Sequence, residues 1–266
     1  MPSRVLQTPV TPTERIMEIL LRCPLFQTTP SLDLERLAAR SRYQQYRRGA
    51  EIVAFGQDGS FMAVIGRGRV KALLSAPDGG LELIVGLLWP GDTFGEMSVF
   101  DHQPRPGAVF AVTETDLVLV PRLELLALLE RRPAVALRVM EGLCAKLRTA
   151  MQFGVSIRFF DIPSRLFQRL QYLCAKDGRK QSDGSVRIQH ALSQEDLASS
   201  IGASREALNK LLSEWKKAGE IETGRGYVVV RDFEALRRLL PVATRPHALT
   251  AKTETPPSPS SLRLVH

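Results

Sequence analysis

The sequence predicts an α+β protein: an antiparallel β domain, then one long helix, then a small helical domain that ends in a β hairpin. Three observations predict this class. Glycines divide the segment from about Glu51 to Pro121 into short apolar runs, a pattern typical of β sandwiches and barrels. Apolar residues recur at helical spacing from Pro133 to about Phe160. Two short segments with helix-capping residues then precede a Gly-Arg-Gly turn at residues 224–226.

Size and composition limit the class of protein. With 266 residues, of which 44% are hydrophobic and 24% charged, the chain suits one large or two small soluble domains. No run approaches the ~20 apolar residues of a membrane span, and residues 1–21 do not resemble a secretory signal. Cys23, Cys144 and Cys174 form no CxxC pair, which excludes a disulfide framework and a zinc ribbon. We therefore expect a cytoplasmic protein.

The charge is unevenly placed along the chain. Of the net charge of +8, residues 1–155 carry +2 and residues 156–266 carry +6. A basic second part predicts an anionic partner, most simply nucleic acid. A protein that merely has a basic surface remains the alternative at this point.

Turn chemistry defines the strands of the first domain. The runs 69–75 and 81–88 flank Pro77-Asp-Gly-Gly80, in which proline presets φ and Asp and Gly accept a tight turn. Thr115–Val120 is a further strand, ended by Pro121. Together with the short runs between the other glycines, these strands predict an antiparallel β-roll, or jelly roll.

Two helices follow the β segment. The first is Leu123–Arg131, and Pro133 opens the second, which runs to about Phe160. An a/d seam lies along the second helix at alternating spacings of three and four: Leu137, Met140, Cys144, Leu147, Met151 and Gly154. The seam predicts a dimerisation helix that pairs with its own copy, in which Cys144 would be a buried, inert thiol. A core stripe packed on the β domain is the alternative.

The last part of the chain predicts short elements. Arg165–Ala175 is a helix, Lys176–Ser185 a polar loop and Val186–Gln189 a short strand. The predicted organisation is a disordered N-terminus (1–14), a β-roll sensor domain (15–132), a dimerisation helix (133–160), a winged helix-turn-helix (161–240) and a disordered tail (241–266) that is rich in Pro and Ser.

The helix-turn-helix is predicted from its caps. Ser193 can cap a short helix, with Asp196 at the reciprocal position of a capping box. Gly202 turns the chain, and Ser204 can cap a second helix over Arg205–Ala218, which a glycine closes. Two helices joined by such a turn form a helix-turn-helix.

The second helix has one apolar and one polar face. The apolar face holds Leu208, Leu211, Leu212 and Trp215, and the polar face holds Glu206, Asn209, Lys210, Ser213 and Lys217, with Arg205 at its start. Arg suits guanine, Glu suits cytosine, and Asn or Lys can reach adenine or guanine. A solvated surface face is the alternative. The hairpin Ile221–Val230 speaks against this alternative, because it adds a wing that can place Arg225 near a phosphate. The predicted DNA-binding residues are Ser204, Arg205, Glu206, Asn209, Lys210, Ser213, Lys217 and Arg225.

These motifs resemble a known family. Leu192-Ser-Gln-Glu-Asp-Leu-Ala198 and Gly202-Ala-Ser-Arg-Glu206 look like the DNA-binding domain of the CRP/FNR superfamily of bacterial transcription regulators. Upstream, Gly68-Arg-Val-Lys71, Pro90-Gly-Asp-Thr-Phe-Gly-Glu-Met97 and Pro104-Arg105 look like that family's cyclic-nucleotide-binding β-roll. The resemblance covers about residues 15–240.

The resemblance implies a regulator without enzymatic activity. It implies a homodimer whose recognition helices enter the major groove of palindromic double-stranded DNA. By motif position, Arg205 and Glu206 match the family's base-reading pair, and Lys210 stands where the family often has a second arginine. The resemblance also admits RNA polymerase as a partner. Two alternatives remain: a ligand-responsive interaction module whose DNA domain is non-functional, and an enzyme, for which the four histidines offer no paired catalytic motif.

The implied effector pocket departs from the family pattern. Its candidate residues are Gly95, Glu96, Met97, Arg105, Ala150 and Met151. Pro106 replaces a hydroxyl residue, and Ala150 and Met151 stand where cyclic-AMP-responsive members place hydroxyls. Three lost polar contacts amount to roughly 2–4 kcal/mol, so we expect cyclic AMP not to be the effector. The alternative is a degenerate pocket in which Glu96 and Arg105 pair only with each other.

Other cofactors find little support in the sequence. The family's iron–sulfur sensors need a cysteine cluster, and Cys23 stands alone. Haem needs axial ligands, and His102 is the one candidate near the pocket. A surface loop histidine is the simpler interpretation of this residue. The sequence therefore predicts neither a metal nor a haem.

Overall fold

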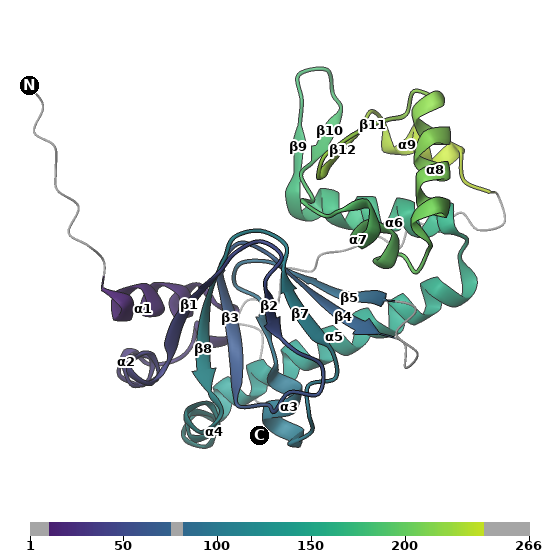
Figure 1. Cartoon of the computed structure of the whole chain (residues 1–266). Coiled ribbons are helices and arrows are strands. Elements are labelled where there is room, and N and C mark those ends of the chain that lie inside the picture. The colour runs from purple at the N-terminus through teal and green to yellow at the C-terminus, as the bar shows by residue number, and fades with distance from the viewer. Residues whose placement is uncertain (1–10, 76–81, 242–266) are drawn as a thin grey trace, which may run out of the picture.

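Two four-stranded antiparallel sheets form the N-terminal domain of the computed structural model, which describes residues 11–75 and 82–241 (Figure 1). The strand orders are β1-β8-β3-β6 and β2-β7-β4-β5. The strands are β1 (Arg42–Tyr46), β2 (Glu51–Val53), β3 (Phe61–Arg67), β4 (Val70–Ser75), β5 (Glu82–Leu88), β6 (Thr93–Phe94), β7 (Ala108–Ala111) and β8 (Thr115–Pro121). The predicted antiparallel β-roll is confirmed, while the predicted turn at 77–80 lies outside the described residues.

Burial and one glycine explain how the roll closes. Ala63, Val70 and Leu117 are fully buried in one cluster with residues of both sheets, as expected where alternate strand residues face the core. Gly68 has φ +85°, and a Cβ there would lie 2.1 Å from the Glu114 carbonyl oxygen. Only glycine fits such a close approach in the left-handed region.

Helices around the roll were not predicted. They are α1 (Pro12–Arg22), a 3₁₀ turn η1 (Pro24–Phe26), α2 (Ser31–Arg40) and α3 (Glu96–Asp101), and α4 (Arg122–Arg131) matches the first predicted helix. The expectation of disorder up to residue 14 is wrong for residues 12–14. Thr11 and Glu14 form a capping box that starts α1, and Ile16, Ile19 and Leu20 bury its apolar face. The same expectation for residues 1–10, and the expected disordered tail from 242 on, lie outside the described residues.

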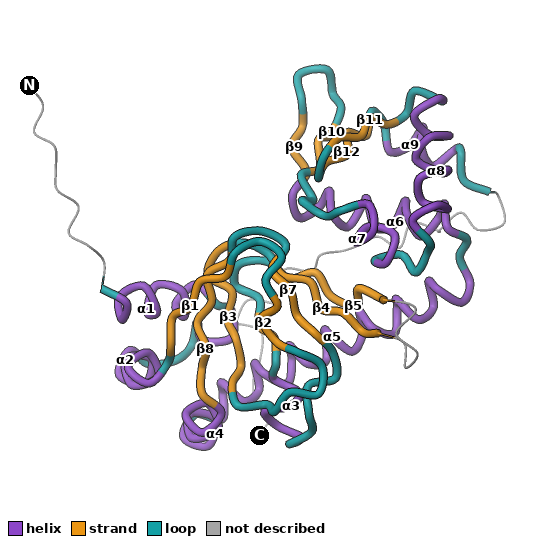
Figure 2. Tube along the Cα trace, viewed as in Figure 1, coloured by secondary structure: helices purple, strands orange, loops and turns teal. Residues whose placement is uncertain are grey.

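The long helix α5 (Pro133–Phe159) is confirmed. In Figure 2 it runs from beside α4 past the sheets to the C-terminal domain. Its predicted seam is not a core stripe, because Leu137, Met140, Leu147 and Met151 are 58, 51, 62 and 65% exposed. Cys144 is also exposed in the single chain, so its burial between two chains stays a prediction. Among the helices that the structure describes, none is long and apolar enough to cross a membrane.

The C-terminal domain combines four helices with one sheet across the described residues. It contains α6 (Ile162–Asp177), β9 (Gly178–Lys180), β10 (Val186–Ile188), α7 (Gln194–Ser199), α8 (Arg205–Lys217), β11 (Ile221–Gly224), β12 (Tyr227–Val230) and α9 (Phe233–Arg238). The sheet order is β11-β12-β10-β9. The predicted loop 176–185 is wrong in part, because α6 continues to Asp177 and β9 pairs with β10. The winged helix-turn-helix itself is confirmed.

Candidate nucleic-acid interface and effector pocket

Local caps set the start of each helix in the helix-turn-helix. Ser193 Oγ accepts from the Asp196 amide at 3.0 Å, and the Asp196 carboxylate accepts from the Ser193 amide at 3.2 Å. Ser204 Oγ accepts from the Ala207 amide at 3.1 Å, which starts α8. Between the helices, Gly202 takes φ +59°. The capping box and the turn glycine are where the sequence places them.

The recognition helix α8 has the two predicted faces. Leu208, Leu211, Leu212 and Trp215 are buried against the domain core. On the other side, Ser204, Arg205, Glu206, Lys210, Ser213 and Lys217 are exposed and Asn209 is half-buried. The first turn of α8 therefore presents a guanidinium and a carboxylate to solvent, and the half-buried amide of Asn209 follows one turn later, as base readout in a major groove requires.

The hairpin β11–β12 carries the predicted wing. Gly226 takes φ +76° in its turn, and Arg225 beside it is exposed. The sequence missed that β9 and β10 extend the same sheet, which adds exposed Arg179 and Lys180. The Arg187 guanidinium lies 3.7 Å from the centroid of the Tyr227 ring. This basic sheet suits contacts to phosphates, which position a protein on DNA without reading sequence.

Two arginines of α6 hold the turn that precedes α8. Arg165 Nη1 donates to the carbonyls of Ile201 and Gly202 at 2.6 and 3.1 Å. Arg169 Nη2 donates to the Ser200 carbonyl at 2.7 Å. Burial lowers the pKa of both guanidinium groups. Sequence reasoning missed this pair, because nothing local links α6 to a turn some 30 residues further along the chain.

The predicted pocket residues Gly95, Glu96 and Arg105 lie together in the β-roll. Arg105 is only 3% exposed, and its Nη1 and Nη2 atoms donate to the Gly95 and Phe61 carbonyls, each at 2.6 Å. The guanidinium carbon lies 4.8 Å from the centroid of the Phe61 ring. Burial lowers the pKa of Arg105, and the negative charge of Glu96 opposes this shift.

Glu96 pairs with a residue that the sequence did not single out. Lys146 lies on α5, and its Nζ donates to Glu96 Oε1 and to the Thr93 carbonyl, each at 2.8 Å. The alternative in which Glu96 pairs only with Arg105 is therefore wrong. Glu96 Oε2 and Arg105 Nε are buried without a hydrogen-bond partner among the described residues. Such orphaned groups are costly and mark a place where a polar ligand would fit.

The other predicted pocket residues, Met97, Ala150 and Met151, are exposed in the single chain. Met97 is 53% exposed on α3. Ala150 follows Lys146 by one helical turn, so both share a face of α5, and Met151 belongs to the seam. Pro106 is exposed. None of these four side chains supplies a hydroxyl.

The part of the chain that the structure describes holds no candidate metal site, and a surface hollow lies away from both predicted sites. The described ranges 11–75 and 82–241 contain no group of three His, Cys, Asp or Glu residues placed to hold a metal. His102 is exposed at the end of α3, with φ 62°, and contacts Arg122.

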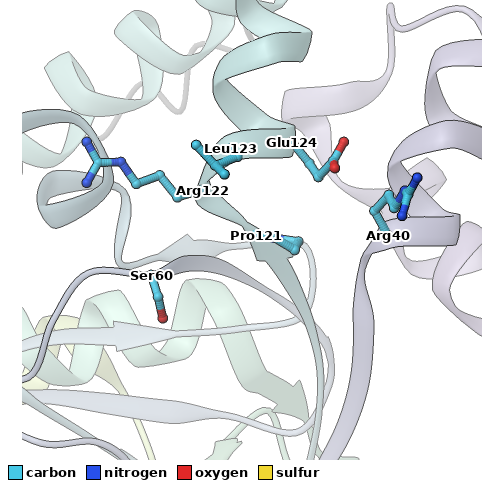
Figure 3. A pocket seen from close by; sticks show the side chains of 6 residues that line it. All are labelled: Arg40, Ser60, Pro121, Arg122, Leu123 and Glu124. Atoms are coloured by element: carbon cyan, nitrogen blue, oxygen red, sulfur yellow. The ribbon is translucent and has the colours of Figure 1, made fainter.

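A hollow of about 390 Å³ is lined by Arg40, Ser60, Pro121, Arg122, Leu123 and Glu124. Figure 3 shows Arg40 and Arg122 on opposite sides of it. It shares no residue with either predicted site.

A buried histidine precedes the helix-turn-helix. His190 is 5% exposed, and its Nδ1 accepts from the Leu192 amide at 3.0 Å. Burial lowers the pKa of His190 from 6.5 to about 4, the charge of Arg69 adds to this shift, and Asp177 opposes it. The folded state therefore holds a neutral imidazole that the unfolded state protonates below pH 6.5.

This histidine predicts a loss of stability in mild acid. Because the folded pKa lies below the unfolded one, stability is complete above pH 6.5 and falls as the pH drops toward 4. At about pH 5 the loss due to His190 is about 2 kcal/mol. His190→Asn keeps an acceptor for the Leu192 amide but does not titrate. Urea unfolding at about pH 7.5 and pH 5 should show a smaller acid loss for the variant. Equal losses in both proteins would contradict the assignment.

Two family models match the chain. The model described as a cyclic nucleotide-binding domain matches residues 43–132, and the model described as a Crp-like helix-turn-helix domain matches residues 164–239. They cover the β-roll with Gly95, Glu96 and Arg105, and the C-terminal domain with the DNA-binding residues, but not Lys146, Ala150 and Met151 of α5.

Relatives and solved structures agree with these matches. A "CRP-like cAMP-activated global transcriptional regulator" of Mycobacterium tuberculosis is 32% identical over 221 residues, which span 83% of this chain and 98% of that protein. A "Cyclic AMP receptor protein" of Thermus thermophilus is 29% identical, over 81% of this chain and 96% of that protein. The c-di-GMP-responsive global regulator CLP of Xanthomonas campestris shares the fold, with TM-score 0.68 and 20% identity over 76% of this chain and all of that chain (100%).

The comparisons change two expectations. They do not favour an interaction module with a non-functional DNA domain, because the helix-turn-helix matches its family model along nearly its whole length. They also do not support the exclusion of cyclic AMP, since the β-roll matches the cyclic nucleotide-binding model and the relatives just named carry cyclic AMP in their names.

Proposed function

This chain belongs to the CRP/FNR family of transcriptional regulators and carries its DNA-binding domain, and from that premise we propose a homodimer that reads a palindromic operator and responds to a cyclic nucleotide. The observation that carries the DNA-reading part is the exposed polar turn at the start of α8, with Arg205 and Glu206 free to reach base edges. Ser204, Asn209, Lys210 and Ser213 continue this surface, and Lys217 and Arg225 serve phosphates.

The exposed seam of α5 supports the dimer. Leu137, Met140, Leu147 and Met151 form a continuous apolar stripe, and exposed stripes of this kind mark protein interfaces. Pairing two such helices in parallel gives an isologous interface and brings Cys144 of both chains to the same level. Two recognition helices then lie on one face of the dimer, as a palindrome with half-sites about one turn apart requires.

The two orphaned polar atoms support a ligand in the β-roll. A buried guanidinium with an unpaired Nε suits an anionic phosphate, and an unpaired carboxylate oxygen suits a ribose hydroxyl. A cyclic nucleotide offers both groups at once. Its phosphate would replace the carbonyls that Arg105 now contacts, while Lys146 stays bonded to Glu96 Oε1 and leaves Oε2 for the ribose. Ala150 and Met151 offer no hydroxyl to the base, so we expect cyclic AMP and cyclic GMP to differ in affinity by less than about tenfold.

Arg105 should decide whether the nucleotide binds. Arg105→Ala removes a charge-assisted contact worth about 1.5–3 kcal/mol, so its affinity for cyclic AMP should fall by about 10- to 150-fold. Arg40→Ala removes an exposed arginine and should leave binding unchanged. Titration calorimetry measures both, and a band shift with and without nucleotide shows whether binding changes operator affinity. Wild-type protein that takes up no cyclic nucleotide would overturn the effector part of the proposal and leave the DNA-binding part standing.

A further inference from the structure

The two domains meet at an aspartate that ends α6. One Asp177 carboxylate oxygen accepts from Arg69 Nη2 at 2.8 Å, and the other accepts from Trp89 Nε1 at 2.9 Å. The Arg69 and Asp177 side chains are only 22 and 14% exposed. Arg69 precedes β4 and Trp89 follows β5, so both donors come from the β-roll and the acceptor comes from the C-terminal domain.

Every other hydrogen bond or ion pair that is described between the roll and the C-terminal domain has the same direction, while Lys176 Nζ of the C-terminal domain lies 5.5 Å from the centroid of the Trp89 ring. Arg69 Nη1 donates to the Gln189 carbonyl at 2.6 Å, and Arg48 Nη2 donates to the Ala191 carbonyl at 3.1 Å. Lys71 forms an ion pair with Asp196, the capping-box residue of α7. The roll thus presents a row of cationic and N–H donors, and the C-terminal domain presents the matching oxygens.

Apolar side chains close the same interface. Leu73, Ile84, Leu87 and Val112 of the roll belong to one buried cluster with the core of the C-terminal domain. The Trp89 ring meets the Tyr172 ring of α6 edge to face, with 5.7 Å between centroids. A packed contact of this kind, unlike a lone surface ion pair, can hold two domains in one relative orientation.

The orientation is passed on to the recognition helix. Asp177 and Tyr172 fix α6 on the roll, and Arg169 of the same helix holds the turn before α8 through the Ser200 carbonyl. The Arg169 guanidinium also lies 5.8 Å from the centroid of the Tyr172 ring. A continuous set of contacts therefore runs from the roll, through α6, to the turn that sets the direction of α8.

We infer that Asp177, with Arg69 and Trp89, is a positioning residue for operator recognition: it holds the DNA-binding domain on its own β-roll, so that α8 keeps one direction relative to α5 before DNA arrives. This inference rests on the proposed dimer, because a fixed direction matters most when two recognition helices must match two half-sites. Preorganisation of this kind reduces the ordering cost of binding. Loss of the contact should therefore weaken operator binding and make operator affinity depend less on the spacing between the half-sites.

Trp89 allows docking to be observed without DNA. The chain contains two tryptophans, and Trp215 is buried in the C-terminal domain at 3% exposure. In a Trp215→Phe background, Trp89 is the sole emitter. Asp177→Asn keeps the side-chain volume but removes the charge that Arg69 and Trp89 share. We expect its Trp89 emission to shift to longer wavelength and to become more accessible to acrylamide. Asp183→Asn, the same change in an exposed loop of the same domain, should leave both readouts unchanged.

Operator binding tests the functional part. With wild-type tryptophans, Asp177→Asn should bind a palindromic operator about tenfold or more weakly. Insertion of one base pair between the half-sites should lower the operator affinity of the wild type and of Asp183→Asn about tenfold. It should lower the operator affinity of Asp177→Asn less than about threefold. Trp89→Phe keeps an aromatic ring against Tyr172 and loses the Nε1 donor, so its operator affinity and its spacing discrimination should fall between those of wild type and Asp177→Asn. It also provides the test if Asp177→Asn does not fold.

Three outcomes would overturn the inference: unchanged Trp89 emission in Asp177→Asn, wild-type spacing discrimination in a folded variant, or tighter operator binding, which would make the contact inhibitory. A wild-type protein that sediments as a monomer would instead overturn the proposed dimer. The Trp89 readout would still report docking in that case, so the two failures are distinguishable.

Discussion

Leu147→Glu is expected to convert the dimer into a monomer and to remove most operator affinity. Leu147 lies in the middle of the α5 seam and is 62% exposed in the single chain. In a symmetric interface each substitution acts twice, so two unpaired carboxylates would be buried close together. A monomer keeps one recognition helix and loses the gain from a second linked site, which is worth about 10²–10⁴ in affinity. We expect operator binding to fall by at least about 100-fold.

Sedimentation equilibrium measures the assembly, and a band shift measures DNA binding. Leu123→Glu is the matched control, because Leu123 is 78% exposed on α4 and away from the seam. It should remain a dimer with wild-type affinity. Cys144 gives an independent check, since mild oxidation should link the two chains of the wild type and not those of Cys144→Ser. An intact dimer in Leu147→Glu would contradict the seam.

Arg205→Ala should remove the preference for one base in each half-site. Its guanidinium stands at the exposed start of α8, where bidentate contact with guanine is worth about 1–3 kcal/mol. The loss should be confined to operators that carry the preferred base, so that variants at that position become nearly equal. Lys217→Ala, at the far end of the same helix, should weaken all sequences by similar factors, because phosphate contacts carry no sequence information.

These two effects are separated by a binding assay on a set of operators in which each half-site position is randomised in turn. We expect a flat profile at one position for Arg205→Ala and an unchanged profile at lower affinity for Lys217→Ala. An unchanged motif in Arg205→Ala would show that this side chain does not read a base. Its position on an exposed face would then reflect solvation alone.

The helix-turn-helix was predictable because its signals are local. Ser193 with Asp196, and Ser204 with the α8 backbone, are capping contacts three residues apart, and such contacts are visible in sequence. The apolar periods of α5 and α8 are local as well. The predicted turn at Gly202 and the wing at 224–226 likewise depend on residues next to each other in the chain.

The missed features are contacts between distant segments. Lys146 meets Glu96 across 50 residues, Arg169 meets Ser200 across 31 and Trp89 meets Asp177 across 88. No pattern in the sequence announces such pairs, because tertiary packing alone brings their elements together. Cyclic AMP was excluded because hydroxyls are absent at Pro106, Ala150 and Met151. Lys146 and the orphaned atoms of Glu96 and Arg105 are products of tertiary packing that this count could not include.

Selection of bound sequences by the full chain from a pool of random double-stranded DNA, with cyclic AMP present and absent, tests whether this protein is a nucleotide-responsive dimer that reads a palindrome. We predict one enriched motif with twofold symmetry, its half-sites about one helical turn apart, enriched differently in the two conditions. Loss of a base preference in the Arg205→Ala selection would link that motif to α8. Enrichment of no motif, or of an asymmetric single half-site bound equally by wild type and Leu147→Glu, would contradict the account.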